Sequence, residues 1–108
     1  MTTPDLKKNI LSDAIIETIK TIYDPEIPIN IYELGLIYEI KVDDDLNAHV
    51  LMTLTSPNCP VAESLPAEVL EKVKAIPGLK SAEVELTFEP TWDKDMMSEA
   101  ALLELGFL

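Results

Sequence analysis

The sequence predicts an α+β domain: a small mixed β-sheet with helices packed on it, in the order α-β-β-α-β-α. Apolar residues recur at helical spacing in three segments and alternate with polar residues in three others. A helical segment also separates the second strand from the third, so a right-handed crossover can bring these two strands parallel. At 108 residues, the chain is expected to form one domain over residues 1–108.

The first helix is expected over residues 6–23. Its apolar residues recur every three or four positions, as in an amphipathic helix: Leu11, Ile15, Ile19 and Ile22, widened by Ile10 and Ala14. Thr3-Pro4 can supply the N-cap and a first-turn proline, and Ser12-Asp13 offers a second possible start. Pro25 is expected to end the helix, because a proline disfavours helical geometry in the residue before it.

A loop and two strands should follow. Pro28 has no backbone N–H to donate to a sheet, so residues 24–31 are expected to form an ordered loop. Gly35 is expected to adopt a backbone conformation that other residues avoid. The strands are predicted over residues 36–42 and 48–55, with a polar hairpin connection between them.

The second strand has two distinct faces, because side chains alternate along a strand. The clearly apolar set is expected to face the core: Val50, Met52 and Leu54. The opposite set should face away from it: His49, Leu51, Thr53 and Thr55.

A second helix and a third strand are predicted after the cysteine motif. Residues 61–76 show a helical stripe made of Leu65, Val69, Val73 and Ile76. Pro60 suits its first turn, Pro66 predicts an irregular beginning, and Pro77-Gly78 should end it. A third strand is expected over residues 80–88.

A loop with the only tryptophan leads to the closing helix. Trp92 is expected to anchor packing with its N–H satisfied. Asp95 or Ser98 can cap the last helix, which should run through Leu105 and end at Gly106.

The net charge of −12 excludes some classes of partner. Nucleic acid is not expected, because the chain has no basic surface to neutralise phosphates, and anionic membranes are disfavoured for the same reason. A basic protein partner is compatible with this charge. The sequence shows no secretory signal or membrane-spanning stretch, and a single cysteine cannot form an internal disulfide, so a reducing, cytoplasmic location is expected.

Cys59 is the first candidate for chemistry, because it lies at the predicted strand-to-helix junction between two prolines. If the helix begins near Pro60, its unpaired amides and its dipole would stabilise a thiolate and lower the thiol pKa. The acidic composition of the chain would instead raise the thiol pKa. The alternative role for Cys59 is a small buried apolar residue.

Four polar residues could support Cys59. Thr55 and Ser56 could hydrogen-bond a thiolate or a ligand, or simply cap the strand end. Asp24 and Glu26 are hard oxygen ligands or acid–base groups if their loop folds against Cys59, and solvated carboxylates otherwise. An acid at a helix C-terminus opposes the dipole, which hints at another role for Asp24.

Other candidates are weaker. His49 has no second histidine or cysteine at ligand spacing, which argues against zinc. Met52, Met96 and Met97 are typical core residues, and the glutamates near the third strand (Glu83, Glu85 and Glu89) indicate a solvated face. One thiol cannot hold an iron–sulfur cluster alone, so a cluster would need ligands from elsewhere.

Three ordered motifs resemble the SufT/PaaD-type iron–sulfur cluster assembly family. Residues 24–38 (DPEIPINIYELGLIY) are similar to its opening signature, and residues 52–60 (MTLTSPNCP) resemble its cysteine loop. Residues 90–101, with Leu105-Gly106, are similar to its C-terminal signature. The chain departs from the common pattern at Ile27, where leucine is usual, and at Ser56, where threonine or alanine is usual.

The resemblance implies a small α+β metal–sulfur cluster biosynthesis protein that assists delivery of clusters to client proteins without being an enzyme. It implies that Cys59 is the key residue, with Asp24 and Glu26 in the facing loop and Thr55 and Ser56 beside the cysteine. Cys59 and Asp24 are the candidate ligands for iron or a transient cluster. The implied partners are iron–sulfur scaffold or carrier proteins and client apo-proteins, with a homodimer left open. A thiol redox or sulfur-transfer enzyme and a structural adaptor remain the alternatives.

Overall fold

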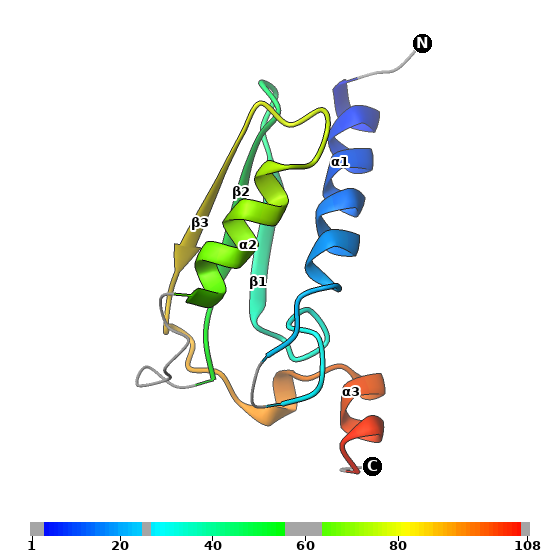
Figure 1. The fold of residues 1–108 in the computed structure, drawn as a ribbon, viewed down its shortest axis with the longest axis vertical. Helices are drawn as coiled ribbons and strands as arrows, with labels where there is room; N and C mark the ends of the chain where they lie inside the picture. Colours follow the sequence, from blue (N-terminus) through cyan, green and yellow to red (C-terminus); the bar gives the residue numbers. More distant parts are fainter. Residues whose placement is uncertain (1–3, 25–26, 56–63, 107–108) are drawn as a thin grey trace.

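The computed structural model describes residues 4–24, 27–55 and 64–106. Helix α1 (Pro4–Ile19) leads to strands β1 (Ile37–Val42) and β2 (Asn47–Met52). Helix α2 (Ser64–Lys74), strand β3 (Ser81–Leu86), a short 3₁₀ turn η1 (Lys94–Met96) and helix α3 (Glu99–Glu104) complete the chain (Figure 1). The predicted order α-β-β-α-β-α is confirmed, and so is the α+β class.

The sheet is mixed, in the strand order β1-β2-β3. β1 pairs with β2 in antiparallel fashion, with Ile40 opposite Val50, and a bulge interrupts the register between Ile37 and Glu39. β2 pairs with β3 in parallel, with Val50 opposite Val84. The parallel pairing follows from the crossover through α2, as the sequence predicted.

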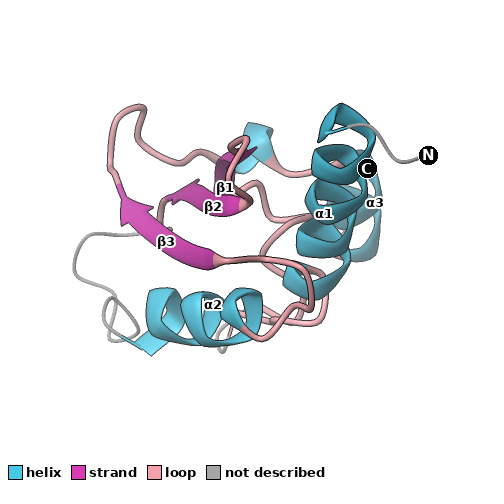
Figure 2. Ribbon diagram, turned by 90° about the horizontal axis from the view of Figure 1, so that it is seen from above, coloured by secondary structure: helices cyan, strands magenta, loops and turns pink. Residues whose placement is uncertain are grey.

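Both long helices pack on the same side of the sheet (Figure 2). α1 contacts β1 and α2, and α2 contacts β3, so the core lies between these two helices and the strands. The inward-facing residues of β2 are buried, as predicted for Val50 and Met52. Among the described residues, the outward side chains of β1 and β3, such as Glu39, Glu83 and Glu85, are exposed.

The first helix ends earlier than predicted, at Ile19 instead of residue 23. The chain tightens there, because Thr21 N donates to Thr18 O and Ile22 N donates to Ile19 O. Ile22 is still fully buried, so its place in the apolar stripe was correct although its backbone is not helical. The helix also runs continuously from Pro4, which makes Ser12-Asp13 wrong as a start. Thr3, the predicted N-cap, lies outside the described residues.

The second helix begins at Ser64, and the predicted part before it, residues 60–63, lies outside the described residues. Pro66 is the third residue of the described helix, a position that tolerates proline because the first amides of a helix have no intrahelical acceptor. The irregular beginning that Pro66 predicts stays a prediction. Leu65, Val69 and Val73 are buried as the predicted stripe. None of the helices in the described ranges is both long and apolar enough to cross a bilayer.

The C-terminal segment is fastened to the turn before β1. Trp92 Nε1 donates to the carbonyl of Leu34 at 2.8 Å, which confirms the predicted anchor. Ser98 N donates to Glu33 O at 2.8 Å. The Ser98 hydroxyl accepts from Ala101 N and caps α3, so Ser98 and not Asp95 is the cap. Gly35 has a φ of +83°, as its predicted special conformation requires.

Candidate functional site

The segment from Ile22 to Ile31 folds back on itself as a narrow loop. Ile31 N donates to Ile22 O at 2.9 Å, Tyr23 and Asn30 form an isolated antiparallel bridge, and Asp24 N donates to Ile29 O at 3.4 Å. Ile22, Ile29 and Ile31 turn their side chains into the core. In its described part, Asp24 and residues 27–31, the predicted loop is therefore ordered and has its own backbone pairing. Pro25 and Glu26 lie outside the described residues.

Asp24 is buried at the end of this pairing, with only 6% of its surface exposed. Its Oδ1 accepts a hydrogen bond from Ile27 N at 3.1 Å. Such a bond lowers the cost of removing a carboxylate from water. Asp24 also lies five residues after the end of α1, so the expected conflict with the helix dipole does not arise. Within the described ranges, Asp24 is the one buried residue with an acidic side chain.

The end of β2 is joined to the same region. After Met52 the chain leaves the sheet, and Thr53 N donates to Leu36 O at 2.8 Å. Leu36 N in turn donates to Ile31 O at 3.1 Å. Through these two hydrogen bonds, the segment that follows β2 and leads toward the cysteine motif is joined to the segment that follows Asp24.

Thr53 is the clearest departure from the predicted strand faces. It was expected to point away from the core with Thr55, but it is completely buried, next to the buried Leu54. Thr53 lies one residue beyond the end of β2, so the alternation of the strand faces does not extend to it. Thr55 itself is partly exposed.

The structure thus brings two of the predicted site residues, Asp24 and Thr55, to the same end of the sheet, where β1 begins and β2 ends. Glu26, Ser56 and Cys59 lie outside the described residues. His49 lies on the open face of the sheet, where its Nε2 is 3.1 Å from Glu85 Oε1. Across the described part of the chain, no three or more histidine, cysteine or acidic side chains are grouped as a metal site would need.

Sequence reasoning missed the residues that hold this end of the sheet together. Asn30 Oδ1 accepts from Glu33 N at 2.9 Å and so begins the turn over residues 31–35. An asparagine ahead of a turn is a recognisable local signal. The contribution of Leu36 had no such signal, because it joins the two segments through its backbone N–H and its backbone carbonyl.

Comparisons with known proteins place the chain among assembly factors. A model of the family described as iron-sulfur cluster assembly protein matches residues 12–86. An Fe-S protein maturation auxiliary factor of Porphyromonas gingivalis is 54% identical over 96 residues, covering 89% of this chain and 91% of that protein. The Fe-S protein maturation auxiliary factor SufT of Staphylococcus aureus is 41% identical over 85 residues, covering 79% of this chain and 97% of that protein.

The fold has a close solved counterpart. A domain of unknown function from Bacillus anthracis superposes with a TM-score of 0.88 at 28% sequence identity, covering 96% of this chain and 99% of that one. Together with the sequence relatives, this match confirms the predicted resemblance and the predicted fold. The role of Cys59 stays a prediction.

Proposed function

This chain belongs to the iron–sulfur cluster assembly protein family, and we propose that it is an accessory factor that helps deliver clusters to client apo-proteins. In this proposal it works as a single domain and is not a catalyst. Its partners are the scaffold or carrier proteins that supply a cluster and the clients that receive it. The reducing cytoplasm suits this role, because the lone thiol must stay free.

One observation carries the proposal beyond family membership. The chain keeps a carboxylate, Asp24, buried at the end of the sheet from which the chain continues into the cysteine motif. Burying an ionisable side chain there costs stability, and a core residue of the same size would fill the space without that cost. This cost supports a functional role for Asp24, because it arises at the end of the sheet from which the chain continues into the cysteine motif.

The proposed chemistry is ligand exchange. Cys59 binds iron or a transient iron–sulfur cluster through its thiolate, which is the ligand such clusters prefer. Asp24 can supply a hard oxygen ligand to iron, with Glu26 beside it, and the hydroxyls of Thr55 and Ser56 can hydrogen-bond to the sulfur. Because one thiolate is too few to hold a cluster, the remaining ligands come from the partner. The iron or cluster can therefore be transferred when a client apo-protein replaces the partner that supplied the other ligands.

The test uses Cys59→Ala and Asp24→Asn in a strain that lacks the natural protein. We expect both variants to accumulate and melt like the wild type, because Asn keeps the oxygen that accepts from Ile27 N. We expect both to lower aconitase-type activity in cells grown under iron limitation. Anaerobic reconstitution, with iron and sulfide quantified, should show less bound iron for Cys59→Ala than for the wild type.

Asp45→Asn is the matched control, since it removes one acidic charge in the β1–β2 connection, at the opposite end of the sheet. It should leave client activity unchanged. Full client activity in cells that contain only Cys59→Ala would overturn the proposed role of the thiol. A pH-dependent alkylation rate showing a strongly depressed thiol pKa, together with turnover of a thiol substrate, would instead favour a thiol enzyme.

A further inference from the structure

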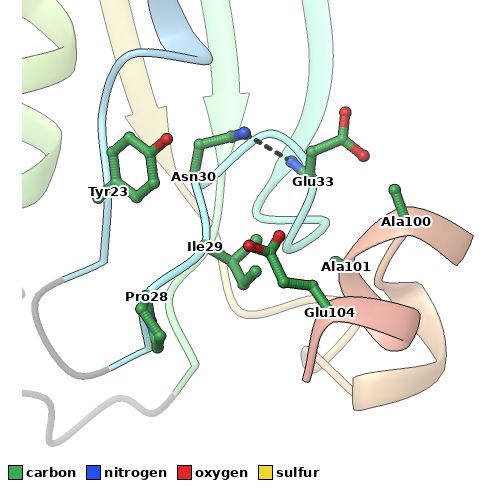
Figure 3. A pocket seen from close by; sticks show the side chains of 8 residues that line it. All are labelled: Tyr23, Pro28, Ile29, Asn30, Glu33, Ala100, Ala101 and Glu104. Atoms are coloured by element: carbon green, nitrogen blue, oxygen red, sulfur yellow. Dashed lines mark hydrogen bonds between the residues drawn. The ribbon is translucent and has the colours of Figure 1, made fainter. Parts of the chain in front are cut away.

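A small pocket lies between the Asp24 loop and the last helix (Figure 3). Its volume is about 300 Å³ when the open space at its mouth is included, so the enclosed part is smaller than a typical ligand pocket. That size suits one side chain better than a cofactor. The pocket is lined by residues of the segment before β1 and of α3: Tyr23, Pro28, Ile29, Asn30, Glu33, Ala100, Ala101 and Glu104.

The lining combines an apolar wall with two carboxylates. Pro28, Ile29 and the alanines of α3 supply the apolar part. Glu33 comes from the turn before β1, and Glu104 reaches from α3 toward Ile29 (Figure 3). Tyr23 is 58% exposed, so one more flat side chain could stack on its ring.

The two carboxylates lack a counter-charge in the described part of the chain. The lysines there that form ion pairs do so with other acids: Lys8 with Asp44, Lys20 with Glu17, Lys41 with Glu39 and Lys72 with Glu68. The described residues that line the pocket include no basic side chain. The pocket therefore presents two negative charges beside an apolar surface, which complements a long cationic side chain.

We propose that this pocket binds an arginine side chain of a partner protein. The guanidinium is planar, carries five donors and can bond two carboxylates at once, while its stem covers the apolar wall. A lysine offers one compact charge and fits a two-carboxylate site less well. Free arginine is a poorer occupant, because its own carboxylate would be repelled by Glu33 and Glu104. The net charge of −12 also draws a basic segment toward the protein.

This inference goes beyond the role in cluster delivery and does not depend on it. The pocket shares Tyr23, Ile29 and Asn30 with the loop that holds Asp24. A partner anchored here would lie beside the proposed cluster site. The two proposals fail separately, because arginine binding can be measured without iron and in the Cys59→Ala variant.

The experiment is an NMR titration of the ¹⁵N-labelled protein with three short peptides of blocked ends, identical except for a central arginine, citrulline or lysine. Citrulline has nearly the same shape as arginine and no charge. We expect the arginine peptide to shift the amides of Tyr23, Asn30, Glu33 and the α3 residues, with saturation. The citrulline peptide should bind at least about tenfold more weakly, because the charge-assisted hydrogen bonds are lost. The lysine peptide should fall between the two.

The variant E33Q/E104Q should bind the arginine peptide at least about tenfold more weakly than the wild type does, while its circular dichroism spectrum and melting temperature stay unchanged. E71Q/E83Q removes the same charge from exposed positions on α2 and β3, and it should bind as the wild type does. No saturable shifts with the arginine peptide, equal binding of citrulline or lysine, or equal losses in the two double variants would each overturn the proposal. The affinity for the arginine peptide should also fall at high salt, because salt screens the attraction between the guanidinium and the carboxylates.

Discussion

At the scale of single residues, two glycines with the same backbone angle make different demands. Gly35 and Gly106 both have a φ of +83°, which residues with a Cβ adopt at a cost. A Cβ on Gly35 would clash with the carbonyl of Met96, whereas a Cβ on Gly106 would meet nothing within 4 Å among the described residues. Gly35 therefore lets the turn before β1 and the C-terminal segment approach each other.

Gly35→Ala and Gly106→Ala separate the two effects. We expect Gly106→Ala to lower the free energy of unfolding by at most about 1–2 kcal/mol, the cost of the backbone angle alone. Gly35→Ala should cost about 1–3 kcal/mol more, because the backbone of Met96 must move. Urea unfolding followed by circular dichroism measures both. Equal losses would mean that the close approach at Met96 adds nothing to stability.

At the scale of elements, the β1–β2 connection is organised by one aspartate. Asp43 Oδ1 accepts from the backbone amides of Asp45 and Asn47, each at 2.9 Å, and its Oδ2 accepts from Asn47 Nδ2 at 3.1 Å. The bonds from the Asn47 backbone amide and side chain are the main cause that lowers the pKa of Asp43. The three consecutive aspartates thus include one that shapes the hairpin.

The lowered pKa of Asp43 sets the sign of a pH effect. Its charged form is favoured by folding, so the stabilisation is complete above the unfolded-state pKa, about 3.9, and is lost as pH falls through the lower folded-state pKa. Asp43→Ala should lower the melting temperature at neutral pH, and its difference from the wild type should shrink in acid. Asp45→Ala, which keeps the Asp43 carboxylate, should show neither effect. A difference from the wild type that is constant down to strong acid would contradict this account.

At the scale of the whole molecule, the C-terminal segment closes the end of the domain that holds Asp24. It follows the part matched by the family model, which ends at residue 86. It is tied to the turn before β1 through Trp92 and Ser98, and Tyr38 Oη donates to Pro90 O at 2.7 Å. Because Leu34 is completely buried, its carbonyl depends on the indole N–H.

Trp92→Phe tests this closure. We expect a loss of about 1–3 kcal/mol in the free energy of unfolding, since the variant leaves the buried Leu34 carbonyl without the indole donor. Tyr38→Phe removes a hydrogen bond in an exposed setting and should cost less than about 1 kcal/mol. Circular dichroism in urea compares the two. A smaller loss for Trp92→Phe than for Tyr38→Phe would show that the closure depends on other contacts.

Much of the fold could be read from local spacing. Leu65, Val69 and Val73 form their helical stripe, and Val50 and Met52 face the core, because side-chain periodicity depends on the backbone of one element alone. The parallel pairing of β2 and β3 followed from the helix that connects them. The prediction for Thr53 was wrong because β2 ends at Met52, one residue before it, and the strand was predicted to continue to residue 55.

The candidate site was predictable in its residue types and not in its arrangement. The sequence alone determined the element order, the apolar faces, the special turn at Gly35 and the family motifs around Asp24 and Cys59. Only the tertiary structure decided that α1 stops at Ile19, that Asp24 is buried against Ile27 N, and that Glu33 and Glu104 line one pocket. The reason is physical: spacing is a property of neighbours in the chain, whereas burial and pairing depend on segments that meet only when the whole domain packs.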